Sequence, residues 1–251
     1  MKIAVILAAG RGSRINKITK FKPKTLISLW GKTLLQRQIE ILSQYKSVKK
    51  IYVITGYKKK IIENICMNYK NVETVHNKTW SSSNMVTSLS KIKNIPFKTV
   101  IISYGDIFYP RNFLNKIVNN KKSISILYDR EWIKLWKKRF INYWDDAESF
   151  NLDKKNIITS IGLKLNKNDK PKGQFIGIIK MNKIGWFNFI NTYYSLDTLK
   201  RQKIDFTSFL NQMIKNKKKV YGIATNLKWG EIDNFKDLQF YKREFSKKYF
   251  S

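Results

Sequence analysis

The feature that most restricts the fold of this chain is a series of short apolar runs separated by segments with helical spacing. The apolar runs of the first half are rich in Val, Ile and Leu and cover residues 3–9, 51–55, 99–103 and 124–128. The segments between them place apolar side chains on one helical face, at residues 32–46, 58–69, 84–93 and 111–119. Buried strands that alternate with helices form mostly parallel sheets. We therefore predict an α/β fold, with a Rossmann-like, mostly parallel (mixed) sheet flanked by helices on both faces.

The second half of the chain is less regular and predicts additions to the same sheet. Helices are expected at 131–140 and 205–216 and from Asn234 onward, and strands within 149–153, 157–162, 174–181 and 219–225. No Pro-, Gly- or Ser-rich linker divides the two halves. We therefore expect residues 1–251 to form a single domain.

The composition narrows the partners and the compartment. Lys and Arg number 50 against 17 Asp and Glu, a formal net charge of +33 that attracts polyanions such as nucleic acid, anionic membranes or phosphorylated small molecules. Lys, Asn and Ile are all abundant, so compositional bias accounts for this charge as well. The single cysteine, Cys66, excludes an intramolecular disulfide and favours a cytoplasmic location. No apolar stretch approaches the roughly 20 residues of a membrane span.

The glycine-rich segment that follows the first apolar run has several possible interpretations. A signal peptide is disfavoured, because its apolar core would be very short and its removal would delete the first strand. A dinucleotide fingerprint requires a third glycine at the position of Ile15. A P-loop around Gly31-Lys32-Thr33 requires a glycine where Leu26 stands. The residues present are all compatible with a loop that binds a nucleoside triphosphate.

Two glycines with small neighbours let the backbone of such a loop approach phosphate groups closely. Positive charge gathers at the same strand end, from Arg11, Arg14, Lys22 and Lys24. Arg suits forked recognition of phosphate oxygens, and Lys supplies a movable point charge. The residues themselves thus favour a triphosphate site after the first strand.

At this point the sequence resembles the nucleotidyltransferase superfamily, which transfers nucleotidyl groups to phosphorylated small molecules. The signature L-A-[AG]-G-x-G-[ST]-R followed by K-P-K is present as "LAAGRGSR" and "KPK". The resemblance implies that Arg14 and Lys24 are catalytic and that the nucleotide contacts Leu7, Ala8, Ala9, Gly10, Arg11, Gly12 and Ser13. It also implies Mg²⁺ as cofactor, held by Asp106 beside the nucleotide and by Asp233 near the C-terminus. Many relatives carry a further acid where Tyr104 stands.

Within the superfamily, the sequence is most similar to choline-phosphate and phosphonate-type cytidylyltransferases. "LAAG", Gly56-Tyr57 and "NMVTSL" at 84–89 match their pattern. The resemblance implies CTP as substrate and a base and ribose pocket formed by Gly56, Tyr57, Ser83 and Asn84. Ser83 fits equally as the N-cap of the helix that follows. The segment 129–186 resembles enzymes of phosphonate metabolism and of surface polysaccharide decoration. Residues 1–128 are then mainly nucleotide-binding, and residues 129–251 mainly bind the acceptor and supply the second metal ligand.

The expected reaction needs alignment and charge neutralisation more than a protein nucleophile. An oxygen of the acceptor phosphate or phosphonate attacks the α-phosphorus of CTP, and pyrophosphate leaves. The only histidine is His76, which we interpret as structural or exposed, so a Ser/His/Asp triad is not expected. Cys66 is interpreted as a buried structural thiol.

The acceptor is the least determined part of the prediction. Its phosphoryl group is expected near Arg130, Arg139 and Lys164. Glu148 and Glu231 are expected to contact the rest of the acceptor; Asp145 and Asp146 precede Glu148, and Glu231 is near the proposed metal ligand. Carboxylates favour a primary amine, as in aminoethylphosphonate or a phosphorylated amino acid or amide, over phosphocholine. The helical spacing of Trp132, Leu135, Trp136 and Arg139 is also typical of a packing face.

Two alternatives remain. A sugar-1-phosphate uridylyl- or guanylyltransferase would use the same scaffold, and a basic nucleic-acid-binding protein would use the charge. No recognition-helix or RNA-binding motif supports the latter, so no nucleic-acid partner is expected.

Overall fold

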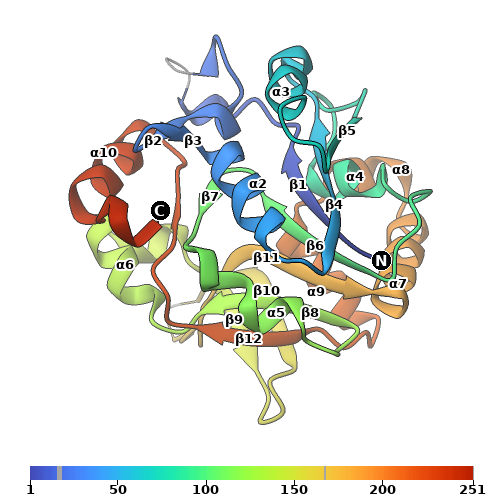
Figure 1. Ribbon diagram of the computed structural model, residues 1–251. Helices are drawn as coiled ribbons and strands as arrows, with labels where there is room; N and C mark the ends of the chain where they lie inside the picture. Colours follow the sequence, from blue (N-terminus) through green and yellow to red (C-terminus); the bar gives the residue numbers. More distant parts are fainter. Residues whose placement is uncertain (16–18, 167, 251) are drawn as a thin grey trace.

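A seven-stranded sheet lies at the centre of the computed structural model, which describes residues 1–15, 19–166 and 168–250 (Figure 1). Its strands, in spatial order, are β12 (Tyr221–Thr225), β8 (Ile124–Asp129), β11 (Gln174–Asn182), β6 (Thr99–Tyr104), β1 (Lys2–Ala8), β4 (Val48–Thr55) and β5 (Val72–His76). Only β11 runs antiparallel to its neighbours, β6 and β8. The sheet is therefore mostly parallel but mixed, as the sequence predicts.

Helices cover both faces of the sheet. Alternate side chains of β1 point to opposite faces, so each face carries apolar residues that a helix can bury. Ile3, Val5 and Leu7 pack in one apolar cluster, beneath α4 (Met85–Ser90), α7 (Lys183–Ser195) and α9 (Phe206–Lys215). Ala4 and Ile6 pack in a second cluster, beneath α2 (Leu34–Gln44), α3 (Lys59–Cys66), α5 (Asn115–Val118) and α6 (Trp132–Arg139). The remaining described helices are α8 (Thr198–Lys203) and α10 (Phe235–Glu244). None of the described helices is long and apolar enough to cross a membrane.

Short elements complete the frame around the sheet. Small two-stranded pairs are formed by β2 (Ser28–Leu29) with β3 (Lys32–Thr33), by β7 (Ile107–Phe108) with β13 (Gly230–Glu231), and by β9 (Glu148–Leu152) with β10 (Ile158–Lys164). Single 3₁₀ turns are η1 (Ser13–Ile15), η2 (Lys24–Leu26), η3 (Arg111–Leu114), η4 (Tyr143–Asp146) and η5 (Lys247–Phe250).

Most predicted elements correspond to those observed, but strand β5, helices α7 and α8 and the short strands β2, β3, β7 and β13 are absent from the prediction. The helix expected at 111–119 is the 3₁₀ turn η3 followed by the short helix α5. Helix α7 is absent from the prediction, because its sequence "KIGWFNFINTYYS" carries aromatic and apolar residues around most of its circumference and gives no clear helical stripe. Strands β11 and β12, from the second half of the chain, join the same sheet as β1, whereas β9 and β10 form a separate pair.

Several residues with two interpretations prove to be structural. Trp132 and Trp136, both on α6, are buried in the core. Lys32-Thr33 forms β3, and the Thr33 side chain caps α2 by accepting from the Gln36 amide. Cys66 is buried, and burial raises the pKa of its thiol to about 12, so the thiolate that a nucleophile requires is disfavoured. His76 lies on the edge strand β5 against Thr55.

The topology brings distant segments to one edge of the sheet. Strands β1, β4 and β6 are parallel, so the loops after them emerge at the same edge. The pairing of β7 with β13 then brings residues 230–233 beside the loop that follows β6, where the Ile232 amide donates to the Asp106 carbonyl at 3.1 Å. A candidate site therefore forms from residues that are far apart in the chain.

Candidate active site

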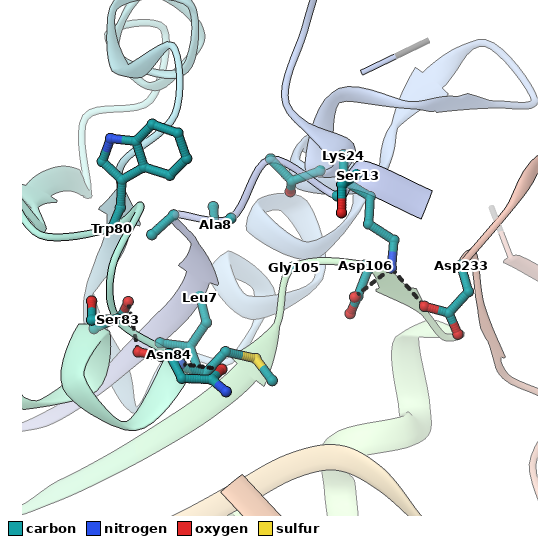
Figure 2. A pocket seen from close by; sticks show the side chains of 16 residues that line it. Leu7, Ala8, Ser13, Lys24, Trp80, Ser83, Asn84, Gly105, Asp106 and Asp233 are labelled. Atoms are coloured by element: carbon teal, nitrogen blue, oxygen red, sulfur yellow. Dashed lines mark hydrogen bonds and ion pairs between the residues drawn. The ribbon is translucent and has the colours of Figure 1, made fainter. Parts of the chain in front are cut away.

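A cleft opens at this edge and has two chemically different ends (Figure 2). Trp80, Ser83 and Asn84 lie on one side of the end of β1, and Lys24, Asp106 and Asp233 lie on the other (Figure 2). The complete lining is Leu7, Ala8, Ala9, Gly10, Gly12, Ser13, Lys24, Thr25, Trp80, Ser83, Asn84, Met85, Ser88, Gly105, Asp106 and Asp233. One end offers an aromatic ring and amide groups, and the other offers charge.

The loop after β1 is shaped by the requirement to pack against Lys24. Gly12 has a φ of +76°, and a Cβ atom on it would lie 2.6 Å from the Cβ of Lys24. A Cβ on Gly10, by contrast, would meet nothing within 4 Å. The loop is closed by hydrogen bonds from the Ile15 amide and the Thr19 hydroxyl to the Gly12 carbonyl, at 3.1 and 2.9 Å. Gly12 thus lets the stem of Lys24 pass directly beneath the loop.

The Lys24 ammonium lies between two carboxylates from distant parts of the chain. Its Nζ is 2.8 Å from Asp106 Oδ2 and 2.8 Å from Asp233 Oδ1. Burial lowers the pKa of Lys24, but the carboxylates of Asp106, Asp233 and Glu231 outweigh it and hold this pKa above its ordinary value. Lys24 therefore remains a cation at this end of the cleft.

Three carboxylates gather around this point. Asp106, Glu231 and Asp233 each contribute an oxygen, and these oxygens all lie within 4.8 Å of one another. Asp106 Oδ1 is buried and has no hydrogen-bond partner among the described residues. Burial and the neighbouring carboxylates of Asp233 and Asp106 raise the pKa of Glu231 well above its ordinary value. Converging oxygen ligands with an excess of negative charge fit a divalent cation such as Mg²⁺.

The position of Asp106 is fixed by a buried glutamine of α2. The Gln38 amide nitrogen donates to the carbonyls of Tyr104 and Ile107, at 2.9 and 2.7 Å, on either side of the turn that carries Asp106. The Ser103 hydroxyl donates to Gln38 Oε1 at 2.8 Å. Gly105 permits the turn to lie against β1, since a Cβ on it would be 2.5 Å from the Leu7 carbonyl oxygen.

The uncharged end of the cleft is supported from behind by the loop after β4. The Tyr57 amide donates to the Ala9 carbonyl at 2.9 Å, and the Tyr57 ring lies 5.4 Å from that of Trp80. A Cβ on Gly56 would lie 2.5 Å from both the Ala9 carbonyl oxygen and the Trp80 Cβ. Gly56 and Tyr57 therefore support the lining, while Trp80 forms part of it.

Asn84, not Ser83, caps helix α4. Asn84 Oδ1 accepts from the Met85 amide at 2.7 Å, and the Asn84 side chain also donates to the Lys203 carbonyl at 3.2 Å. The N-cap interpretation of Ser83 is therefore wrong; its hydroxyl donates to the Thr79 carbonyl at 2.7 Å instead. Both residues line the cleft.

The basic residues predicted for this site lie in very different places. Arg11 is exposed, with its guanidinium 5.7 Å from the centre of the Tyr57 ring, and does not line the described cleft. The backbone of Arg14 belongs to η1, but its side chain lies outside the described part of the structure. Arg130 and Lys164 are exposed and are not among the described residues that line the cleft.

The interpretation of Arg139 as an acceptor ligand requires correction. Its side chain has an exposed fraction of 0% and pairs with Asp237 at 3.3 Å and Asp233 at 3.8 Å. Such a guanidinium is already occupied by protein carboxylates and is closed off from an acceptor.

A second cavity adjoins the charged end of the cleft and shares Met85 and Asp233 with it. Its acidic lining consists of Asp146, Glu148, Asp205, Glu231 and Asp233. Its aromatic lining consists of Tyr104, Phe175 and Phe206, and the Tyr104 ring packs edge-on to Phe175 with centroids 5.7 Å apart. Tyr104 thus belongs to the wall of the second cavity and is not among the described residues that line the cleft. Glu231 belongs to both the carboxylate group and this cavity.

Sequence reasoning missed Thr25, Trp80, Met85, Ser88 and Gly105 in the cleft lining. Trp80 offered a signal, because a large aromatic beside "SSSN" at a strand end is poorly explained by a polar turn. Gly105 directly precedes Asp106 and offered a second one. Thr25, Met85 and Ser88 gave none, since only the packing of η2 and α4 turns them toward the cleft.

We predict that Gly12→Ala destabilises the protein by about 1–2 kcal/mol, the cost of a left-handed conformation for a residue with a Cβ, and displaces Lys24. Thermal unfolding compared with Gly10→Ala tests this, because Gly10 has open space for a methyl group. Equal stability of the two variants would contradict the packing role of Gly12.

Comparisons with known proteins agree with this geometry. Residues 4–140 match the family model described as the MobA-like NTP transferase domain. The chain is 30% identical over 248 residues to the CTP:phosphoglutamine cytidylyltransferase of Campylobacter jejuni subsp. jejuni serotype O:2, covering 94% of this chain and 97% of that protein. It is 29% identical over 143 residues to the choline-phosphate cytidylyltransferase of Streptococcus pneumoniae, covering 57% and 59% of the two chains.

Among solved structures, the inositol-1-phosphate CTP transferase from T. maritima superposes with a TM-score of 0.74 at 18% identity, over 98% of each chain. This likeness shows the fold. The matched domain and the full-length similarity together show that the chain belongs to the MobA-like NTP transferase family and is a nucleotidyltransferase.

Proposed function

We propose that the protein is a cytidylyltransferase that moves CMP from CTP to a phosphorylated or phosphonylated small molecule and releases pyrophosphate. The observation that carries this proposal is the Lys24 ammonium held between Asp106 and Asp233 beside the glycine-rich loop. The choice of CTP is supported by the names of the relatives, which are CTP:phosphoglutamine and choline-phosphate cytidylyltransferases.

In the proposed reaction, an acceptor oxygen forms a bond to the α-phosphorus while the bond from that phosphorus to the pyrophosphate oxygen breaks. Lys24 supplies positive charge where negative charge accumulates on the phosphate oxygens. Gly10, Gly12 and Ser13 would contact the triphosphate, and Trp80 and Asn84 the nucleoside, since all five line the cleft. Asp106, Asp233 and Glu231 would hold Mg²⁺, which supplies Lewis-acid stabilisation of the phosphates when bound.

The second cavity supports an acceptor that carries an amine. A chain with a net charge of +33 repels cations in general, yet this cavity collects five carboxylates next to the proposed metal ligands. Burial raises the pKa of Glu148, and an ammonium ion at this position would stabilise its charged form. We therefore favour acceptors such as aminoethylphosphonate or a phosphorylated amino acid or amide, with phosphocholine as the quaternary alternative.

We place the reaction in the cytoplasm, as a step that activates a headgroup for attachment to a surface polysaccharide or lipid. Nucleoside triphosphates are available in that compartment, and an unpaired thiol such as Cys66 remains reduced there.

The base and the acceptor can be determined in one experiment. We expect pyrophosphate release with CTP and an amine-bearing acceptor in a panel of the four NTPs crossed with phosphorylated acceptors. Turnover with UTP or GTP and a sugar 1-phosphate, and none with CTP, would replace the proposal with the sugar-nucleotide alternative. Tight, steeply salt-dependent nucleic-acid binding without turnover would favour the binding-protein alternative.

We predict that Asp106→Asn lowers kcat by at least about 100-fold, the scale on which one electrostatic group at a transition state contributes. Far-UV circular dichroism should remain that of the wild type, because Gln38 still holds the turn around residue 106. Glu73→Gln, on the edge strand β5, is the matched control and should turn over normally. Near-normal activity of Asp106→Asn would refute the metal assignment.

We predict that Glu148→Gln raises the KM for an amine-bearing acceptor by about tenfold or more, which corresponds to one hydrogen bond to a charged group. The KM for CTP should change little, because Glu148 lines only the second cavity. An acceptor analogue without the amine should lose nothing. If the variant weakens both acceptors equally, the carboxylate does not recognise the amine.

A further inference from the structure

Arg139, the last residue of α6, points into the segment that carries the second proposed metal ligand. Its Nε and Nη2 both lie 3.3 Å from Asp237 Oδ1, and Nη2 also donates to the Glu231 carbonyl at 3.3 Å. Nη2 lies 3.8 Å from Asp233 Oδ2. The other oxygen of that carboxylate, Oδ1, faces Lys24. The two cations therefore hold Asp233 from its two sides.

Asp237 transmits this restraint to the backbone. Its Oδ2 accepts from the amides of Asp233 and Asn234, at 2.8 and 3.0 Å, while its Oδ1 faces the guanidinium. Asp237 is at the start of α10, and α6 and α10 lie beside each other at one end of the molecule (Figure 1). The Arg139–Asp237 pair thus connects α6 to residues 231–234.

Arg139 is buried among aromatic rings, whose faces attract a cation but do not replace the hydrogen bonds that it loses on leaving water. The guanidinium lies 4.9 Å from the ring centres of Trp136 and Phe140 and 5.7 Å from that of Tyr241. Its Nη1 is buried without a hydrogen-bond partner among the described residues. An apolar side chain commonly stabilises such a position better than a buried ion pair does. Packing alone therefore does not explain the guanidinium, whereas the carboxylates that it orients do.

We propose that Arg139 is a positioning residue for the divalent-metal site, acting through Asp237 to fix Asp233 and Glu231 in the orientation that binds the cation. The inference rests on the proposed function, in which these carboxylates hold Mg²⁺. Groups that orient metal ligands typically change metal affinity or activity by 10- to 100-fold when they are mutated.

The test measures Mn²⁺ binding directly, by the electron paramagnetic resonance signal of free Mn²⁺ titrated with the whole protein. Arg139→Lys keeps the charge but loses the forked geometry, and Asp237→Asn keeps the shape but loses the charge. Lys138→Met is the matched control, because Lys138 neighbours Arg139 on α6 but its side chain is 65% exposed. We expect both site variants to bind Mn²⁺ at least about tenfold more weakly and the control to bind as the wild type does.

Two further readouts separate positioning from a general structural role. The double variant should weaken Mn²⁺ binding by less than the two single effects combined, because Arg139 and Asp237 are in direct contact and do not act independently. In turnover assays, the Mg²⁺ concentration for half-maximal rate should rise in Arg139→Lys. The acceptor KM at saturating Mg²⁺ should stay within about twofold of the wild-type value, because mutations at independent sites affect each other by no more than this.

Wild-type Mn²⁺ affinity in a folded Arg139→Lys protein would overturn the proposal. A raised acceptor KM with unchanged metal affinity would also overturn it and would return Arg139 to the acceptor site. Failure of the wild type to bind Mn²⁺ would remove the metal site itself. Because Mn²⁺ binding requires no turnover, a wild type that binds Mn²⁺ but does not use CTP would refute only the proposed function.

Discussion

The contact of the Lys24 ammonium with Asp106 and Asp233 is the interaction on which the site depends. It joins residues separated by 82 and by 209 positions in the chain. A buried carboxylate pair without a cation would be strongly unfavourable, and so would a buried ammonium without the pair. The three segments that carry these charges are therefore stable in this arrangement only together. The same constraint places the glycine-rich loop, since Lys24 passes directly under Gly12.

Close backbone approaches make this charged contact possible. Gly105 lets the turn after β6 lie against the end of β1, and Gly56 lets the loop after β4 lie against Ala9. The short pairing of β7 with β13 then brings residues 230–233 within reach. A Cβ atom on either glycine would force the segments apart, because it would lie 2.5 Å from a backbone carbonyl oxygen.

The molecule has a large positive net charge, yet the cavity beside its candidate site is lined by acidic residues. The 50 basic residues are spread over the chain, but six of the 17 acidic residues line the cleft and the adjoining cavity, where Lys24 is the one Lys or Arg among the described lining residues. Such a contrast attracts anionic nucleotides toward the protein while reserving one interior region for cations. Arg139 is a buried cation near these carboxylates, and it pairs with Asp233 and Asp237 and not with a ligand.

Much of the molecule follows from the sequence alone. Periodicity determined β1, β4, β6 and β8 and most helices, because the hydrophobic effect acts on local patterns of apolar side chains. Missing residues, at Ile15 and Leu26, were enough to reject two loop types, and the family signature located Lys24, Asp106 and Asp233. Helix α7 was not predicted, because a helix that is apolar on most sides lacks the amphipathic pattern on which the prediction depends.

Only the tertiary structure decided the roles of residues whose partners are distant. Arg139 resembles a phosphate ligand in sequence, but 98 positions separate it from Asp237, and burial beside that residue converts it into an internal counterion. Glu231 lies in the carboxylate group because β13 pairs with β7. Helix α4 is capped by Asn84 and not by Ser83, because the helix begins one residue later than a Ser83 cap would require. Local patterns fix which elements form, whereas charge pairing and close packing between distant segments fix which side chains meet.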